Sequence, residues 1–225
     1  MAKLRYRLAP YNRVFMPPMI TDPKINDYMM KLSFEADPLL IEMERIGRAN
    51  DFPIVDRLVG RLLFLLTILK NPRLVVELGS GYGYSAYWFA KALAKGGRVV
   101  LTDYDEANIT HAKEAFQKAG LSKKAEFKVG DAVRTATGYG GIDILFIDID
   151  KHQYLPAIKK LLPNLNRNSL VIADNTLWYG RVAGRQRDRD TVGIRQFNEY
   201  MFRTPAFFST IVPLRDGVLI ASKID

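Results

Sequence analysis

Short apolar runs alternate with helical stretches between residues 73 and 173, and this alternation constrains the fold more than any other feature of the sequence. The runs that read as strands are 73–78, 98–102, 125–129, 143–148 and 169–173, and helices are expected at 84–95, 105–120 and 152–162. Strands that alternate with helices form a parallel sheet with helices on both faces. Strands without a polar side also fit a sheet that is covered on both faces. We therefore expect an α/β fold.

Helical stretches precede this region, and a hairpin follows it. Asp-Pro pairs at 22–23 and 37–38 each combine an N-cap with a proline at the first helical position. A third stretch, 56–70, should present one apolar face made by Leu58, Leu62, Leu65, Leu66 and Leu69. After a helix at 191–202, strands at 207–213 and 217–223 are joined by so short a turn that they should pair.

These elements predict a seven-stranded, mostly parallel sheet with an antiparallel C-terminal hairpin and extra N-terminal helices. We expect one domain over residues 1–225. It comprises a basic extension at 1–21, helices at 22–71 and a core at 72–225.

Composition excludes several classes of protein and site. The chain of 225 residues has no cysteine, which rules out disulfides, thiolate metal sites and a cysteine nucleophile. Its most apolar segment, 58–69, is too short to span a bilayer and contains Arg61. Pro17 and Pro18 interrupt the only candidate for a signal peptide. We expect a cytoplasmic protein without a membrane partner.

The net charge of +9 is concentrated in two segments. Residues 1–13 contain four basic residues and no acid, and residues 181–189 contain four arginines and one aspartate. A locally basic surface indicates an anionic partner, which a phosphate, a carboxylate or a nucleic acid would satisfy. A solubilising surface without a partner explains the charge equally well.

The glycine-rich turn "VVELGSGYGYS" (75–85) follows the first strand of the sheet. A turn that binds a dinucleotide would have a third glycine where this chain has Tyr84. Glu77 would repel a pyrophosphate and attract an amine, and Asp103 stands where a ribose diol is usually bound. With Asp131 and Ala132 after the third strand, the pattern indicates a cationic nucleoside without phosphate, such as S-adenosylmethionine. The alternative is a structural glycine turn beside structural acids.

Acidic side chains also end the next two strands, at Asp148 and at Asp174 with Asn175. Ligands of an open parallel sheet bind at these carboxyl ends. Two carboxylates and an amide oxygen suit Mg²⁺. Zinc prefers histidine and cysteine ligands, and this chain has only two histidines and no cysteine. Lys151 should reach the same site as a general base, and Asp150 should face the cofactor. Without Asp148 and Lys151 nearby, Asp174 and Asn175 would read as loop caps.

The motifs "VVELGSGYGYS", "FIDIDKHQY" and "IADNTLWYGRV", in this order, resemble the metal-dependent class I O-methyltransferases. That family includes catechol and caffeoyl-CoA O-methyltransferases and small bacterial relatives. The resemblance implies a Rossmann-like class I methyltransferase fold, S-adenosylmethionine as cofactor, a homodimer, and methylation of one of two adjacent hydroxyls. It also implies Lys151 as base and Mg²⁺, or another hard cation such as Mn²⁺ or Ca²⁺, on Asp148, Asp174 and Asn175.

The strand ends and the resemblance together imply these cofactor contacts: Val55, Glu77, Gly79, Ser80, Gly81, Gly83, Ser85, Asp103, Asp131, Ala132, Asp148 and Asp150. Trp178 reads either as a wall for a flat ring or as ordinary core packing. Tyr154 and Tyr179 are further candidates for substrate contact. Plant members have an asparagine where this chain has Tyr179, so the resemblance does not extend to coenzyme A esters.

Three kinds of function remain open. The first is a catechol-type O-methyltransferase that acts on small, preferably anionic, aromatic diols, with the arginines of 181–189 at the mouth of the site. The second is an enzyme that methylates 5-hydroxyuridine in tRNA, which the basic segments favour. The third, a protein that binds the cofactor without turnover, conflicts with a full metal set beside Lys151.

Overall fold

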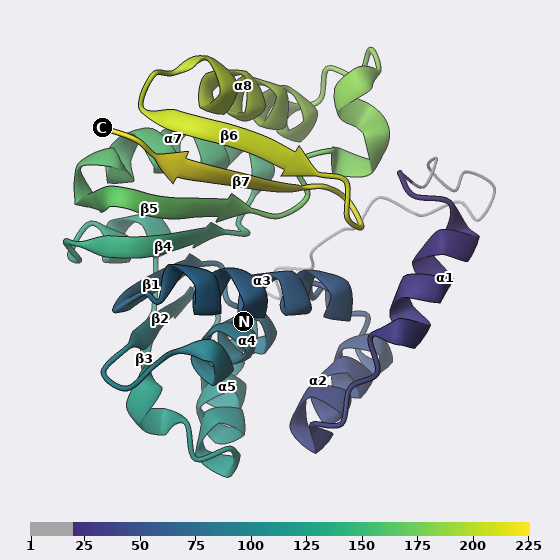
Figure 1. The fold of residues 1–225 in the computed structure, drawn as a ribbon, viewed down its shortest axis with the longest axis vertical. Coiled ribbons are helices and arrows are strands. Elements are labelled where there is room, and N and C mark those ends of the chain that lie inside the picture. The colour runs from purple at the N-terminus through teal and green to yellow at the C-terminus, as the bar shows by residue number, and fades with distance from the viewer. Residues whose placement is uncertain (1–19) are drawn as a thin grey trace, which may run out of the picture.

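The computed structural model describes residues 20–225, so the predicted basic extension lies almost entirely outside the described residues (Figure 1). The described strands form one seven-stranded sheet in the order β3-β2-β1-β4-β5-β7-β6. Strands β1 to β5 are parallel, and β7 runs antiparallel to both β5 and β6. Their bounds are β1 (Leu74–Leu78), β2 (Arg98–Asp103), β3 (Ala125–Val129), β4 (Ile142–Ile147), β5 (Leu165–Ala173), β6 (Phe207–Val212) and β7 (Val218–Lys223). The predicted mixed sheet with its antiparallel hairpin is confirmed.

Most of the α-helices begin at an aspartate that caps them, whereas α4 and α7 do not. Asp22, Asp37 and Asp56 each accept a hydrogen bond from a backbone N–H of the first turn that follows. The α-helices are α1 (Pro23–Leu32), α2 (Pro38–Ala49), α3 (Arg57–Lys70), α4 (Tyr84–Ala92), α5 (Glu106–Lys118), α6 (Ala132–Ala136), α7 (Tyr154–Leu161) and α8 (Arg189–Arg203). Short 3₁₀ turns are η1 (Ser122–Lys124), η2 (Lys151–Gln153), η3 (Leu162–Asn164) and η4 (Trp178–Ala183).

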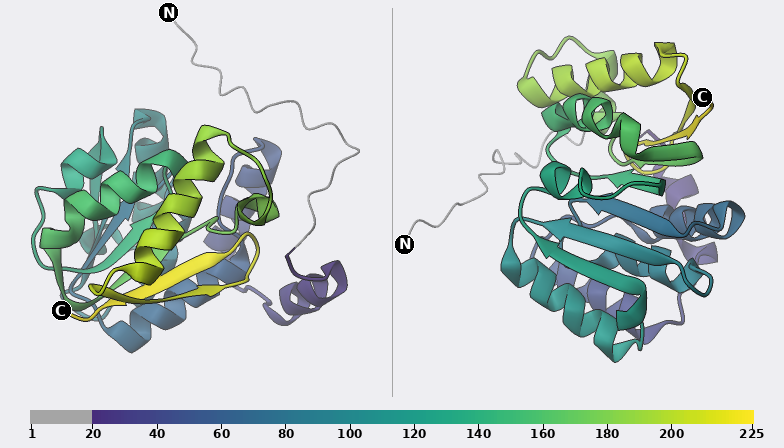
Figure 2. Two further views of the ribbon diagram at one scale, coloured as in Figure 1. Left: turned by 90° about the horizontal axis from the view of Figure 1, so that it is seen from above. Right: turned by 90° about the vertical axis from the view of Figure 1, so that its left-hand side faces the viewer.

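Helices cover both faces of the sheet (Figures 1 and 2). Val75 of β1 belongs to a core cluster with residues of α3, α4 and α5, whereas its neighbour Val76 belongs to a cluster with residues of α6, α7 and α8. Successive side chains of a strand point to opposite faces, so the apolar residues on both sides of β1 require this double cover. Within residues 20–225, no helix combines the length and the apolar character needed to cross a membrane.

The predicted apolar face of α3 is wrong in part. The helix buries Leu58, Val59, Gly60, Leu63 and Thr67, whereas Leu65 and Leu69 are 53% and 73% exposed. The buried side is selected by contact with α4, where Trp88 lies against Gly60. Thr67 is compatible with burial because its hydroxyl donates to the carbonyl of Leu63 at 2.7 Å.

The N-terminal helices differ in how firmly they are attached. Helix α1 buries no residue and stands apart from the sheet in Figure 2. Helix α2 is anchored by Glu44, which is buried and accepts hydrogen bonds from Arg57 of α3 and from the hydroxyl of Tyr84 of α4. These bonds fix the segment between α2 and α3 next to the glycine turn after β1.

Candidate active site at the carboxyl ends of the strands

Strand β1 ends in a glycine turn that lies directly against the end of β4. Gly79 has a φ of +83°, which favours glycine, and a Cβ at this position would overlap the backbone carbonyl of Asp148. The amide of Asp148 in turn donates to the carbonyl of Leu78 at 2.9 Å. The two strand ends therefore leave no space for a side chain between them.

A hollow opens above this turn. The residues that line it come from the segment after α2, the glycine turn, the start of α4 and the end of β4: Phe52, Pro53, Ile54, Val55, Gly79, Ser80, Gly81, Tyr84, Ser85 and Asp148. Six of the predicted cofactor contacts are in this set. The hollow thus joins residues that lie far apart in the sequence.

Glu77 is fully buried at the end of β1 beside this hollow. The Ser85 hydroxyl donates to its Oε1, whereas Oε2 is buried without a hydrogen-bond partner among the described residues. Burial raises the pKa of Glu77 to about 8. A buried carboxyl with an unsatisfied oxygen is costly unless a donor meets it, so this position favours a ligand with a cationic amine.

The acids that follow β2 and β3 shape the backbone around them. Asp103 accepts hydrogen bonds from the amide of Gly81 at 2.9 Å and from the amide of Asp105 at 2.8 Å. Asp131 caps α6 by accepting from the amide of Arg134, and this hydrogen bond lowers the pKa of Asp131. Ala132 follows as a buried residue. Asp103 therefore ties the glycine turn to β2.

Lys151 is 8% exposed, and its Nζ is held by several groups. It donates to Asp148 Oδ1 at 2.8 Å, to the hydroxyl of Tyr154 at 2.8 Å and to the carbonyl of Ile149 at 3.2 Å. Tyr154, a candidate for substrate contact, is fully buried, and its hydroxyl also donates to the carbonyl of Asp174 at 3.1 Å. This tyrosine thus links Lys151 to the end of β5.

Asp174 is fully buried at the end of β5. Its Oδ2 accepts from Arg215 at 2.8 Å, whereas Oδ1 is buried without a hydrogen-bond partner among the described residues. Burial, together with the charge of Asp148 and against that of Arg215, raises the pKa of Asp174 to about 6. Asn175 follows with a φ of +56° and is also buried.

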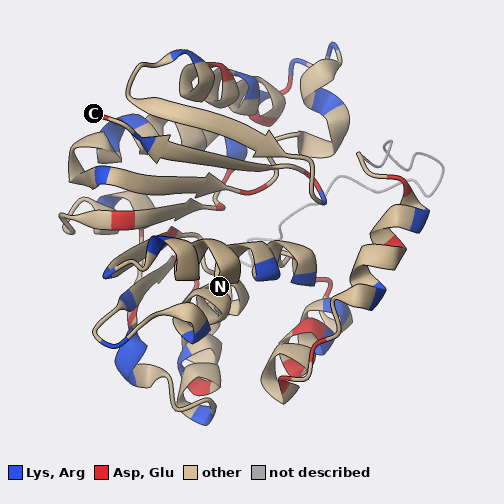
Figure 3. Ribbon diagram, viewed as in Figure 1, with Lys and Arg blue, Asp and Glu red and all other residues tan. Residues whose placement is uncertain are grey.

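The oxygens left open at this place fit a hard cation. Each of the two carboxylates has one oxygen bound by a basic side chain, and the unpartnered Oδ1 of Asp174 is available to a metal. Within residues 20–225, no three acidic or histidine side chains gather into a metal-binding cluster. The predicted set of Asp148, Asp174 and Asn175 therefore depends on the amide oxygen as its third ligand. Figure 3 shows acidic segments where β4 and β5 end.

Other predicted residues lie at the rim. Asp150 is exposed and directly precedes η2. Trp178 is half-buried, with its ring 5.8 Å from Lys151 Nζ, and its indole N–H is buried without a hydrogen-bond partner among the described residues. Tyr179 is 40% exposed, and its ring centroid lies 5.4 Å from that of Trp178. Both residues have positive φ, at +46° and +53°.

The sequence did not single out Arg215 and Asp216 of the turn between β6 and β7. Arg215 binds Asp174, and the buried carboxyl of Asp216 accepts from the amide of Tyr179. In the sequence, "LRDG" reads as a hairpin turn and nothing more. Two adjacent residues of opposite charge in a hairpin turn are the signal that could have indicated a further role.

The arginine-rich loop after η4 is held mainly by Arg195, which lies outside the loop. Arg195 of α8 donates to the backbone carbonyls of Arg181, Val182, Gly184 and Gln186 at 2.7–2.8 Å. Arg181 pairs with Asp188 at 2.6 Å. Arg185, Arg187 and Arg189 are exposed.

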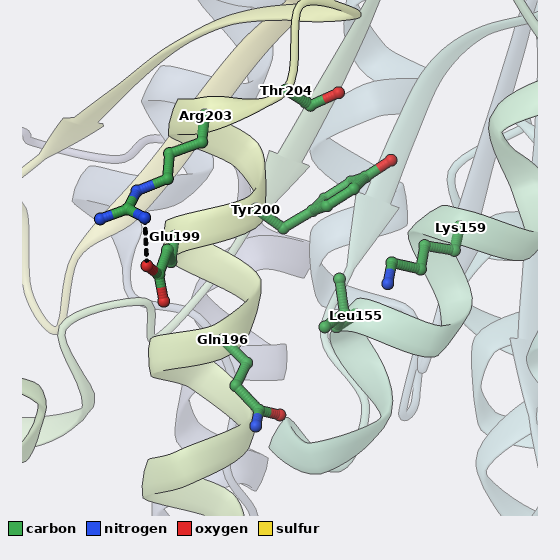
Figure 4. Close-up of a pocket in the computed structure, with 7 residues that line it drawn as sticks. All are labelled: Leu155, Lys159, Gln196, Glu199, Tyr200, Arg203 and Thr204. Carbon is green, nitrogen blue, oxygen red and sulfur yellow. Dashed lines mark ion pairs between the residues drawn. The ribbon is translucent and has the colours of Figure 1, made fainter.

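An open groove lies elsewhere, on the outer side of α7 and α8 (Figure 4). It contains an ion pair between Glu199 and Arg203 at 2.8 Å, and Lys159 lies over the ring of Tyr200. None of the predicted site residues lines it.

Comparison with known proteins identifies close similarities over most of the chain. Residues 30–224 match the family model described as O-methyltransferase. A catechol O-methyltransferase of Niastella koreensis is 30% identical over 84% of this chain and 91% of its own length. A catechol O-methyltransferase of Mycobacterium tuberculosis is 27% identical over 84% of this chain and 88% of its own length.

Solved structures agree with the sequence comparison. A methyltransferase from Geobacter sulfurreducens has a TM-score of 0.81 at 39% identity, with 92% of this chain and 99% of that chain covered. The O-methyltransferase from Bacillus cereus in complex with SAH (S-adenosylhomocysteine) has a TM-score of 0.81 at 26% identity, with 89% and 97% covered.

Proposed function

The chain belongs to the O-methyltransferase family, and from this premise we propose that it methylates one hydroxyl of a vicinal aromatic diol with the help of Mg²⁺. S-adenosylmethionine supplies the electrophilic methyl group. The observation that carries the proposal is the pair of acids at the ends of β4 and β5. Asp174 Oδ1 is buried without a partner among the described residues, and Lys151 is bound to Asp148.

The residues around the hollow would bind and orient the cofactor. The unsatisfied oxygen of Glu77 suits the cationic amine of the methionine part. Asp103, at the end of β2, suits the ribose diol. Val55 and the segment around it close the hollow on the side of α2 and thus exclude water from the methyl group.

Asp148, Asp174 and Asn175 would hold the cation, which would orient both oxygens of the diol and favour loss of a proton from one of them. Lys151, as the neutral amine, would take that proton at Nζ, which Asp148 and Tyr154 fix beside the same acids. The oxygen then attacks the methyl carbon while the carbon–sulfur bond breaks. The remainder of the rate enhancement comes from the positioning of two bound reactants.

A methyl-transfer assay with labelled cofactor tests this proposal. We expect turnover of 3,4-dihydroxybenzoate and of neutral catechols but not of the corresponding 1,3-diols, because only adjacent hydroxyls can share one cation. Excess EDTA should abolish turnover, and Asp174→Ala should lower it by roughly 10²-fold or more. Glu199→Gln, in the groove outside the site, serves as the matched control. Full activity in EDTA would contradict the metal requirement.

The same assay includes tRNA that contains 5-hydroxyuridine. The relatives described above are named catechol O-methyltransferases, so we propose a catechol as the acceptor and include the tRNA only as a tested alternative. If that tRNA were methylated and no catechol were, the acceptor would be RNA and the proposed acceptor class would be wrong. The homodimer and the cytoplasmic location stay predictions, and light scattering after size-exclusion chromatography measures the first.

A further inference from the structure

The turn between β6 and β7 is fastened to the loop that follows β5. The amide of Thr176 donates to the carbonyl of Gly217 at 2.9 Å, and the amide of Leu177 donates to the carbonyl of Asp216 at 2.9 Å. A Cβ on Gly217 would overlap Leu177. The turn therefore has a fixed position relative to Asp174, Asn175 and Trp178.

Arg215 occupies an unfavourable backbone conformation in this turn. Its φ is +51°, in the left-handed region that a glycine adopts at no steric cost. A non-glycine residue there costs on the order of 1 kcal/mol or more, and such residues cluster at functional sites. Glycine at this position would relieve the strain of the turn. The cost of keeping an arginine there therefore indicates a role for its side chain.

The guanidinium of Arg215 has donors to spare. It donates from one terminal nitrogen to Asp174 Oδ2 at 2.8 Å, and the side chain is 29% exposed. A guanidinium has five N–H donors, and no other hydrogen bond of this side chain is found within residues 20–225. One edge of the planar group thus holds the carboxylate, and further N–H groups can reach an acceptor molecule beside it.

We propose that Arg215 is the residue that selects acceptors carrying a carboxylate, by binding that carboxylate with the donors that Asp174 does not use. This assignment rests on the proposed function, because it takes Asp174 as part of the acceptor site. A guanidinium suits the role, since its fork matches a carboxylate with two parallel hydrogen bonds. The sequence led us to expect an anionic preference from the arginines of the 181–189 loop, and this proposal places it on Arg215 instead.

Two substrates that differ only in charge provide the test. The first is 3,4-dihydroxybenzoate, and the second is the neutral 3,4-dihydroxybenzamide. For wild type, kcat/KM should be higher for the acid than for the amide. In Arg215→Gln, the ratio of the two kcat/KM values should fall by roughly tenfold to a hundredfold, the range of a hydrogen bond between charged groups. The fall should come from KM of the acid.

The ratio is the informative quantity because Arg215 also holds Asp174. Loss of that contact can slow both substrates, but it slows them equally and cancels in the ratio. Arg215→Lys retains the charge without the fork and should give an intermediate ratio. Arg215→Gly relieves the backbone strain, so it folds even where Gln is poorly tolerated, and it should give a ratio as low as Gln.

The matched control replaces Arg185, Arg187 and Arg189 together by glutamine. These exposed charges should change the ratio less than about twofold, since exposed charges at a distance are screened. Equal ratios in wild type and Arg215→Gln, with both substrates turned over, would overturn the role of Arg215 and leave the methyltransferase standing. If the triple variant lost the preference instead, the loop would be the selective element. If wild type methylated neither diol, the proposed function itself would fall, and the assignment of Arg215 with it.

Discussion

At the scale of single residues, the buried carboxyl of Glu77 makes the stability of the fold depend on pH. Glu77 is fully buried with a pKa raised to about 8 by burial, so the ligand-free protein holds it as a neutral acid through most of the physiological range. The unfolded chain loses this proton near the ordinary value of 4.5. Between these two pH values the folded state binds more protons than the unfolded state.

This difference predicts a stability that falls as pH rises. The free energy of unfolding should decrease from about pH 4.5 to about pH 8, by a few kcal/mol at most, because the proton must be removed from a buried group. Glu77→Gln cannot ionise, so its melting temperature should vary less with pH and exceed that of wild type at pH 8. Parallel melting curves against pH for both proteins would contradict the buried neutral acid, and Glu199→Gln should behave like wild type.

Single residues also show what could not be predicted from the sequence alone. Glu77 and Asp174 could be singled out because each lies directly after an apolar run, and Lys151 because it follows the acids that end such a run. Arg215 and Asp216 escaped because their partners are 41 and 37 positions away in the sequence. No local pattern encodes such a contact, which exists only once β7 pairs with β5.

At the scale of elements, the packing of α3 on α4 decides which side of α3 is buried. A leucine stripe indicated one face, but Gly60 lets the helix approach Trp88 and turns Val59 and Leu63 inward. Trp88 is only 3% exposed, and its ring contacts Phe64 and Tyr84 edge to face. The spacing of the five leucines predicts one buried face, but it gives no sign that Gly60 allows a close contact with Trp88.

Gly60→Ala should therefore destabilise the protein even though alanine is the better helix former. Alanine gains about 1 kcal/mol in helix propensity, whereas its Cβ would overlap the indole of Trp88, which has no room to move. Overpacking typically costs 1–3 kcal/mol, so we expect a melting temperature several degrees lower by calorimetry. Gly140→Ala is the matched control, because a Cβ there meets nothing within 4 Å. An unchanged melting temperature for Gly60→Ala would show that the α3–α4 contact can relax.

At the scale of the whole molecule, the candidate site joins four widely separated parts of the chain. The hollow is lined by residues from 52–55 and 79–85, and the proposed acceptor side comprises residues 148–151 and 174–179. The sequence predicted the alternating sheet and its hairpin correctly, because strand and helix periods are local. It missed the short α6 and the first residues of β5, where the polar run 166–169 hides a strand.

A ligand that bridges these parts should stabilise the whole fold. S-adenosylhomocysteine at about 100 times its Kd should add roughly 2.7 kcal/mol to the free energy of unfolding. For a chain of this size, that corresponds to a rise of roughly 5–10 °C in melting temperature. Thermal denaturation monitored by fluorescence measures it. ADP is the control nucleotide, since its phosphates would face the carboxyl group of Asp103; an equal rise with ADP would contradict a phosphate-free site.

The fastened turn between β6 and β7 has a consequence for protein engineering. It touches the acceptor loop but contributes no residue to the hollow lined by Val55, Gly79 and Ser85. A library confined to positions 214 and 215 would vary what the enzyme accepts while leaving the donor half intact. Because position 215 has a left-handed backbone, glycine and asparagine are the replacements that it tolerates best. If Arg215 binds the acceptor as proposed, acceptor scope can be varied at this turn alone, whereas β7 has to be kept because it pairs with both β5 and β6 in the sheet.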